Sequence, residues 1–213
     1  MTWNVLKSQS KTSQVRKQLE LVVFGAPASA TDIEDLTDAQ GALKPLPATY
    51  FPFGLITRDG VTSSVDTETD ETQAHGYAQN VREDIIGATQ TLSVTVYEVY
   101  RKRVLEAAYG IDLTTVKKAA SGEIKFDRPP LPVSADWKLL VVGRDVKGGL
   151  DVYRAKFHPK ARLGQLPEEA WGTEALRFEL QFTIAADDKG IATREFIAGP
   201  GMKADTDAGF TAT

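Results

Sequence analysis

The sequence predicts a mainly β protein of antiparallel strands with one α-helix beside them. Strict alternation of apolar and polar side chains over residues 176–184 places five apolar side chains on one face of a strand. A shorter run over 91–96 has the same period. A single amphipathic stretch over 97–109 ends at Gly110, a residue type common after helices. One helix beside many strands is expected to cover one side of the core.

Turn signals divide the remaining strands. A strand is predicted over 18–24, ahead of an Ala-Pro-Ala break. Because glycine suits tight turns, three hairpins are expected. They join 53–57 to 61–65 through Arg58-Asp59-Gly60, 137–142 to 150–157 through Gly148-Gly149, and 178–185 to 191–197 through residues 187–190. Residues 26–49 and 158–172 are expected to be irregular linkers.

The 213 residues are expected to form one β-rich domain over 18–200. A polar N-terminal arm over 1–17 and a flexible C-terminal tail over 201–213 would flank it. All-β folds of this size are often single domains, and a chain this long can bury a large core. No stretch approaches the ~18 apolar residues of a membrane span, so we expect no membrane partner.

Composition excludes several kinds of chemistry. The chain has no cysteine, which removes disulfides and thiolate nucleophiles, and only two histidines, His75 and His158. A histidine-rich metal centre or a Ser-His-Asp triad is therefore disfavoured. The net charge of −4 and pI near 5.3 argue against a classical nucleic-acid binder, which carries an excess of Lys and Arg. We expect no enzyme activity, catalytic residue, metal or cofactor.

Charge is segregated along the chain. Residues 58–71 carry five acids and one base, whereas residues 136–162 carry seven bases and three acids. Such segregation is typical of oppositely charged surfaces that meet when copies associate. The alternative is that solvated faces of both signs cancel within one folded chain.

The densest acidic feature is the run Asp66-Thr67-Glu68-Thr69-Asp70-Glu71. In an extended strand Asp66, Glu68 and Asp70 project from one side at intervals of about 6–7 Å. A straight row of carboxylates does not close around a metal ion, and it lacks the glycine and glutamate spacing of a calcium loop. We interpret the run as a solvated acidic strip, which would line a channel if copies surrounded one.

The order of these landmarks is itself informative. The segment 53–62 (FGLITRDGVT) leads directly into the acidic row that ends at Glu71. The strand over 91–96 then feeds Tyr97-Glu98-Val99-Tyr100 and a helix that ends in Tyr109-Gly110. Over about residues 18–200 this order resembles the major tail (tail tube) proteins of long-tailed, non-contractile phages, especially those that infect actinobacteria. The polar N-terminus before Gln18 is longer than in that family.

The resemblance implies a β-sandwich or small barrel flanked by a helix. Six copies would form a ring whose inner sheets join into one barrel, and stacked rings would form a hollow tube. The tube would hold the tape measure protein and later conduct double-stranded DNA without binding it specifically. Tail terminator and distal tail proteins would be further partners, and the protein would be made in the host cytoplasm and reside in the virion. Asp66, Glu68, Asp70 and Glu71 would line the lumen or a contact between subunits.

Two alternatives belong to other classes. A carbohydrate-binding or host-adhesion β-sandwich would need a groove lined by exposed aromatic side chains, whereas Trp3, Trp137 and Trp171 are scattered along the sequence. A carboxylate-dependent hydrolase would use the acids of the 66–71 row. Within the tube class, the sequence does not separate a non-contractile tail from a contractile tail or a secretion tube.

Overall fold

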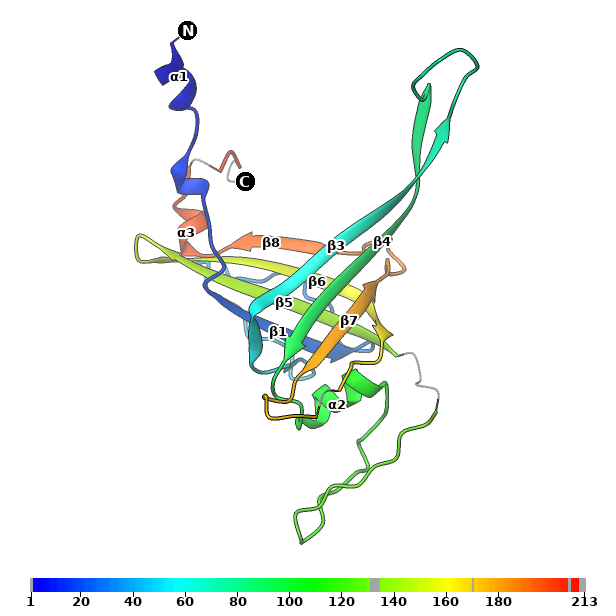
Figure 1. Ribbon diagram of the computed structural model, residues 1–213. Coiled ribbons are helices and arrows are strands. Elements are labelled where there is room, and N and C mark those ends of the chain that lie inside the picture. Colours follow the sequence, from blue (N-terminus) through cyan, green and yellow to red (C-terminus); the bar gives the residue numbers. More distant parts are fainter. Residues whose placement is uncertain (1, 131–134, 170, 207, 211–213) are drawn as a thin grey trace.

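The computed structural model describes residues 2–130, 135–169, 171–206 and 208–210 (Figure 1). Within them the strands are β1 (Glu20–Pro27), β2 (Phe51–Pro52), β3 (Ile56–Thr72), β4 (Arg82–Val96), β5 (Asp136–Lys147), β6 (Leu150–Gln165), β7 (Phe178–Ile184) and β8 (Arg194–Ala198). The helices are α1 (Trp3–Lys7), the short 3₁₀ helix η1 (Thr12–Gln14), α2 (Lys102–Tyr109) and α3 (Pro200–Lys203). All strand pairs are antiparallel, in the order β2-β1-β5-β6-β7-β4-β3, and β8 pairs with β6.

Strand β6 is where the sheet folds over on itself. One edge of β6 pairs with β5 over its length, while the other edge pairs first with β8 and then, from Ala161, with β7. Pro159 lies between these two partners, at a register shift where two residues of β6 oppose one of β5. A bulge tolerates a residue without an N–H group. The β7-β4-β3 layer therefore crosses over the β1-β5-β6-β8 layer (Figure 1).

This course of β6 corrects the predicted linker over 158–172. Residues 158–165 continue the strand that was expected to end at Phe157. His158 is fully buried there and Ala161 packs into the core. The His-Pro pair is typical of a loop, but here the proline occupies the bulge at which β6 changes partners.

The main core lies between the two layers. Leu92, Leu180 and Phe182 point inward from β4 and β7 and are fully buried. The Phe182 ring stacks on Phe53 with centroids 6.3 Å apart. The predicted alternation over 91–96 and 176–184 is therefore confirmed, and the predicted fold class, a β-sandwich flanked by a helix, is what the structure shows.

Helix α2 closes one side of this core with Val104, Ala107 and Ala108. It ends as predicted at Gly110, which has the left-handed conformation (φ 63°) and donates its N–H to Glu106. The helix begins later than predicted, at Lys102. Residues 97–101 form a turn before the helix. In this turn the Glu98 carboxylate accepts a hydrogen bond from the Leu55 N–H (2.8 Å).

A second core covers the far face of the β1-β5-β6 sheet. The connection between β1 and β2 folds back over this face and packs Ile33, Leu36 and Tyr50 against Leu140 and Phe157. The β1-β5-β6 layer is consequently buried on both faces, whereas the β7-β4-β3 layer keeps one face in water.

Of the three predicted hairpins, only the one that joins 137–142 to 150–157 is confirmed. The hairpin of 178–185 with 191–197 is wrong, because β7 pairs with β4 and β6 while β8 pairs with β6. The hairpin around Arg58-Asp59-Gly60 is wrong as well. Strand β3 runs from Ile56 through to Thr72, and the turn that joins it to β4 lies at residues 73–81. Ile56 pairs with Val96 and Val61 with Val94, so residues 57–60 bulge out of the ladder. Gly60 has a φ of 76°, which satisfies the bulge as readily as the expected turn.

The N-terminal arm contacts the segment that follows α3. The Asp205 carboxylate accepts hydrogen bonds from the Gln14 amide and the Arg16 guanidinium, each at 3.0 Å. Part of the tail predicted over 201–213 thus contributes to α3 and contacts the N-terminal arm, while residues 207 and 211–213 lie outside the described residues. No helix in the described ranges is long and apolar enough to cross a bilayer.

Candidate assembly surfaces

The distal parts of β3 and β4 form a two-stranded hairpin that projects beyond the sandwich (Figure 1). We call residues 64–90 the projecting hairpin. These residues carry six acids and one base, whereas the chain as a whole has a net charge of −4. The negative charge of the hairpin therefore exceeds that of the whole chain.

The ladder assigns the predicted acids to two faces. Directly opposed residues of an antiparallel pair share a face, and Asp66, Glu68 and Asp70 alternate along β3 on the face turned away from the core. Glu71 lies on the other face, opposite Glu83. The structure thus brings three of the four predicted residues together and separates the fourth.

A bulge in β4 aligns two further acids, Glu83 and Asp84, with the acidic row of β3, and the sequence pattern did not predict this. The register shifts between Glu68 and Thr69, which leaves Ile86 unpaired and sets Asp84 opposite Asp70. Asp84 also pairs with Arg82 at 2.5 Å. The only sequence signal for these acids was the charged triplet 82–84 beside two isoleucines, and its alignment with the acidic row depends on the position of the turn.

The outward face of the β7-β4-β3 layer carries polar side chains along all three strands. It comprises the even-numbered residues 62–70 of β3, the odd-numbered residues 89–95 of β4 and the odd-numbered residues 179–183 of β7. Every one of these is Thr, Ser, Gln, Asp or Glu, and none is buried. We call this surface the acidic outer face; it offers a wall of hydroxyls and carboxylates to water.

The opposite face of the projecting hairpin continues the core-facing side of the sheet beyond the body. Val65 and Ile85 lie on this face and are 58% and 70% exposed. Ala88, opposite Thr67, lies between them along the ladder, and Glu71 and Glu83 follow Ile85 on the side of the turn. We call this surface the core-side hairpin face. Beyond the Val65–Gln90 pair, where Gln90 accepts a hydrogen bond from Thr193, this face of the hairpin belongs to neither core cluster of the described residues.

The outer edge of β3 has no strand partner within the described part of the chain, since β3 ends the sheet and pairs only with β4. It is the longest strand, at 17 residues. An exposed edge of this length presents unpaired N–H and C=O groups that can pair with another strand.

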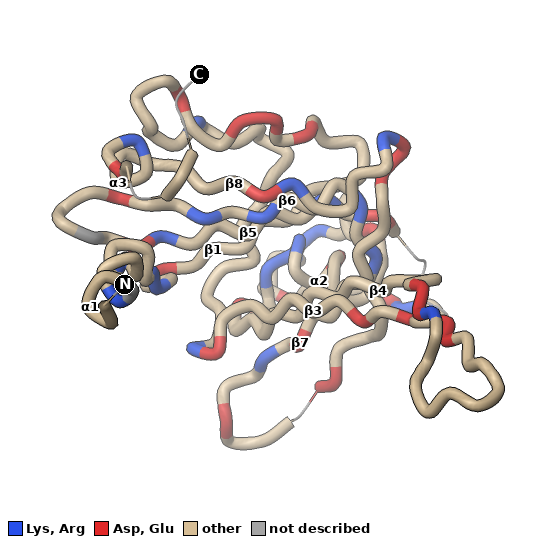
Figure 2. The backbone as a smooth tube through the Cα atoms, turned by 90° about the horizontal axis from the view of Figure 1, so that it is seen from above, with Lys and Arg blue, Asp and Glu red and all other residues tan. Residues whose placement is uncertain are grey.

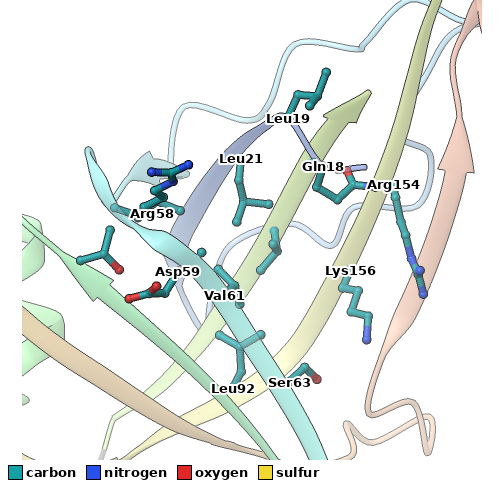
Figure 3. Close-up of a pocket in the computed structure, with 15 residues that line it drawn as sticks. Gln18, Leu19, Leu21, Arg58, Asp59, Val61, Ser63, Leu92, Arg154 and Lys156 are labelled. Carbon is teal, nitrogen blue, oxygen red and sulfur yellow. The ribbon is translucent and has the colours of Figure 1, made fainter. Parts of the chain in front are cut away.

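A cleft of about 660 Å³ opens between the two layers where β1 and β3 diverge. Leu21 from β1 and Val61 from β3 lie on one side, and Arg154 and Lys156 from β6 on the other (Figure 3). Both cations pair with Glu195 of β8, at 3.2 and 3.4 Å. Apolar side chains and polar ones, Arg58 and Asp59 among them, therefore line this gap in the sandwich.

A partly buried polar network joins the base of the hairpin to the body. The Thr193 hydroxyl donates to Gln90 Oε1 (3.0 Å), so its oxygen accepts from His158 Nδ1 (3.0 Å). His158 Nε2 has no hydrogen-bond partner, and burial lowers the pKa of His158 to about 4. The imidazole is therefore neutral at pH 7, and it acts as a fixed polar link between β4, β6 and the segment before β8.

The two histidines do not form a joint site, because His75 is exposed in the hairpin turn and His158 is buried in β6. Across the described ranges, no group of three His, Asp or Glu side chains is arranged to hold a metal ion. The acidic row is instead extended along β3, as its spacing predicts.

The two comparisons with known proteins found no relative from which a function could be inferred. No protein-family model matches the chain, and no curated protein matches it.

Proposed function

We propose that this protein is a structural subunit that assembles with copies of itself into hexameric rings and a hollow tube, as the tail tube of a long-tailed phage. The observation that carries the proposal is the 17-residue edge of β3, which no strand of the described residues pairs with, on a layer that is polar on its outward face. Pairing between copies would cover this edge and join the layers of neighbouring subunits into one sheet.

The acidic outer face supports a role as the wall of the lumen. A continuous sheet formed by the β7-β4-β3 layers would turn one face inward, and this face is already solvated in the single chain. Asp66, Glu68 and Asp70 would then repel DNA phosphates, so that a duplex could pass without being held. The tape measure protein would occupy the same lumen before ejection.

The first test is the state of the purified full chain. Negative-stain microscopy over a range of protein and salt concentrations is expected to show rings or tubes. A particle that stays monomeric under all of these conditions would contradict the proposal.

The lumen assignment is tested by charge reversal on the acidic outer face. Tubes of the Asp66→Lys/Glu68→Lys variant, assembled with short duplex DNA, are expected to retain DNA protected from nuclease, while wild-type tubes retain none. The control is Glu34→Lys/Asp35→Lys, which makes the same charge change at two exposed residues of the β1-β2 connection, over the far face of the other layer. Retained DNA that nuclease still digests would place the acidic outer face on the exterior of the tube.

The alternatives have less support in this structure. Trp137 is buried, and Trp3 and Trp171 are exposed on different segments, α1 and the connection between β6 and β7. A sugar-binding groove would instead need adjacent exposed aromatic side chains. A hydrolase that used the acidic row would lose its activity in an Asp66→Asn/Glu68→Gln variant, whereas a tube subunit would still assemble.

A further inference from the structure

A basic loop projects from the end of the molecule opposite to the projecting hairpin (Figure 1). It lies between α2 and β5, and its tip is a small turn in which Lys118 and Ile124 form a β-bridge. The Ala119 N–H donates to the Glu123 carbonyl (2.8 Å) across this turn. We call residues 117–125 the basic loop; they carry three lysines and one glutamate.

The lysines of the basic loop lie in solvent without a carboxylate partner among the described residues. Lys117, Lys118 and Lys125 are exposed and form no ion pair with any residue that the structure describes. Ile124 between them is 54% exposed. The loop thus presents cations around an apolar side chain, which is the complement of the core-side hairpin face.

The base of the loop is fixed to the body. The Tyr109 hydroxyl donates to Glu169 (2.6 Å), and the Arg128 guanidinium donates to the same oxygen (3.0 Å). These hydrogen bonds lower the pKa of Glu169, so the carboxylate stays ionised. Arg128 also lies over the Tyr109 ring at 4.4 Å. The loop therefore leaves α2 from a defined position.

We propose that the basic loop of one copy docks head to tail on the core-side hairpin face of a second copy. The lysines would face Glu71 and Glu83, and Ile124 would cover Ile85, which lies next to this pair of glutamates. This contact deepens the proposed function, on which it rests, because it names the surfaces that stack one ring on the next. A contact between two different surfaces at opposite ends of a molecule propagates instead of closing on itself.

Charge and exposure together favour a second copy as the partner. The two surfaces lie at opposite ends, so they do not meet within one chain (Figure 1). Figure 2 shows acidic residues near the far end of the β3-β4 hairpin. An isolated two-stranded hairpin is marginally stable in water, so covering its exposed isoleucine would stabilise the hairpin as well as the contact.

The experiment uses charge exchange in the full chain. The hairpin variant is Glu71→Lys/Glu83→Lys, the loop variant is Lys118→Glu/Lys125→Glu, and a third variant combines all four changes. The matched control, Asp66→Lys/Glu68→Lys, makes the hairpin change on the acidic outer face. Microscopy and sedimentation score single rings and stacked tubes, and circular dichroism reports the fold.

The expected result is loss of stacking in the hairpin and loop variants, with single rings retained. Stacking returns in the combined variant and persists in the control. Wild-type stacks should also shorten as salt rises, because the contact joins exposed charges that are screened within about 10 Å at ~0.1 M salt.

Two results overturn the proposal while the proposed function stands: tubes in the hairpin variant as long as those of wild type, or rings of the combined variant that fail to stack. A wild-type chain that forms neither rings nor tubes would overturn the proposed function, and the docking contact with it.

Discussion

Strands β3 and β4 run through two regions that differ sharply. Within the body, Leu92, Val94 and Val96 of β4 point into the core and are fully or almost fully buried. Beyond the body the same face of the same strands carries Ile85 and Glu83, and nothing within the described residues covers it. Alternation therefore defines the faces of a strand, but the neighbouring elements decide whether a face is buried.

The comparison also separates two sources of stability. The body gains free energy by burying apolar side chains between layers. The projecting hairpin has only its own ladder and cross-strand pairs, some of which oppose acid to acid. We expect the hairpin to open locally at a lower free energy than the body unfolds.

The largest expected difference is between truncations in the two regions. Phe182→Ala removes a fully buried ring that stacks on Phe53, and should lower the free energy of unfolding by about 3 to 5 kcal/mol. Ile85→Ala on the hairpin should change it by less than about 0.5 kcal/mol, because the side chain is already exposed. Denaturant unfolding under conditions that keep the chain monomeric measures both. Similar losses would show that the hairpin is packed in solution.

The next effect concerns the junction between the regions. His158 has a pKa of about 4 in the folded chain against 6.5 in the unfolded chain. Between these values the unfolded state binds more protons, so stability is lost as the pH falls from about 6.5 towards 4, by up to about 3 kcal/mol from this residue.

The matching variant is His158→Asn, whose side-chain amide can still donate to Thr193. Its stability should fall less steeply than that of the wild type over this pH range, measured by urea unfolding at each pH. Parallel curves for the two proteins would show that His158 does not contribute to the acid sensitivity.

The smallest effect lies in the hairpin itself. Glu83→Gln removes the repulsion between Glu83 and Glu71. It should raise the free energy of hairpin opening, measured by hydrogen exchange of the hairpin amides, by a few tenths of a kcal/mol. Asp66→Asn is the control, because Asp66 faces Thr89 and has no opposing acid. The gain should vanish at high salt; an equal effect of both substitutions would point to net charge instead of the cross-strand pair.

Local patterns in the sequence correctly predicted the sheet's buried face. The alternation over 91–96 and 176–184 and the helix that ends at Gly110 are confirmed. The predictions that failed concern turns. The signal at Asp59-Gly60 marks a bulge inside β3, and His158-Pro159 marks a bulge inside β6. Glycine and proline suit a bulge and a turn for the same local reasons, so the residue types alone do not separate the two.

The candidate site shows the same division. The spacing of Asp66, Glu68 and Asp70 was sufficient to place them on one face, because side chains of a strand alternate whatever it pairs with. Their alignment with Asp84, the separation of Glu71 and the position of β3 at the edge of the sheet depend on which strands pair and in what register. Pairing is decided by contacts between residues distant in sequence, such as those of β1 with β5 and of β4 with β7. The sequence by itself determined the faces, and only the tertiary structure decided which face and which edge were left without a neighbour.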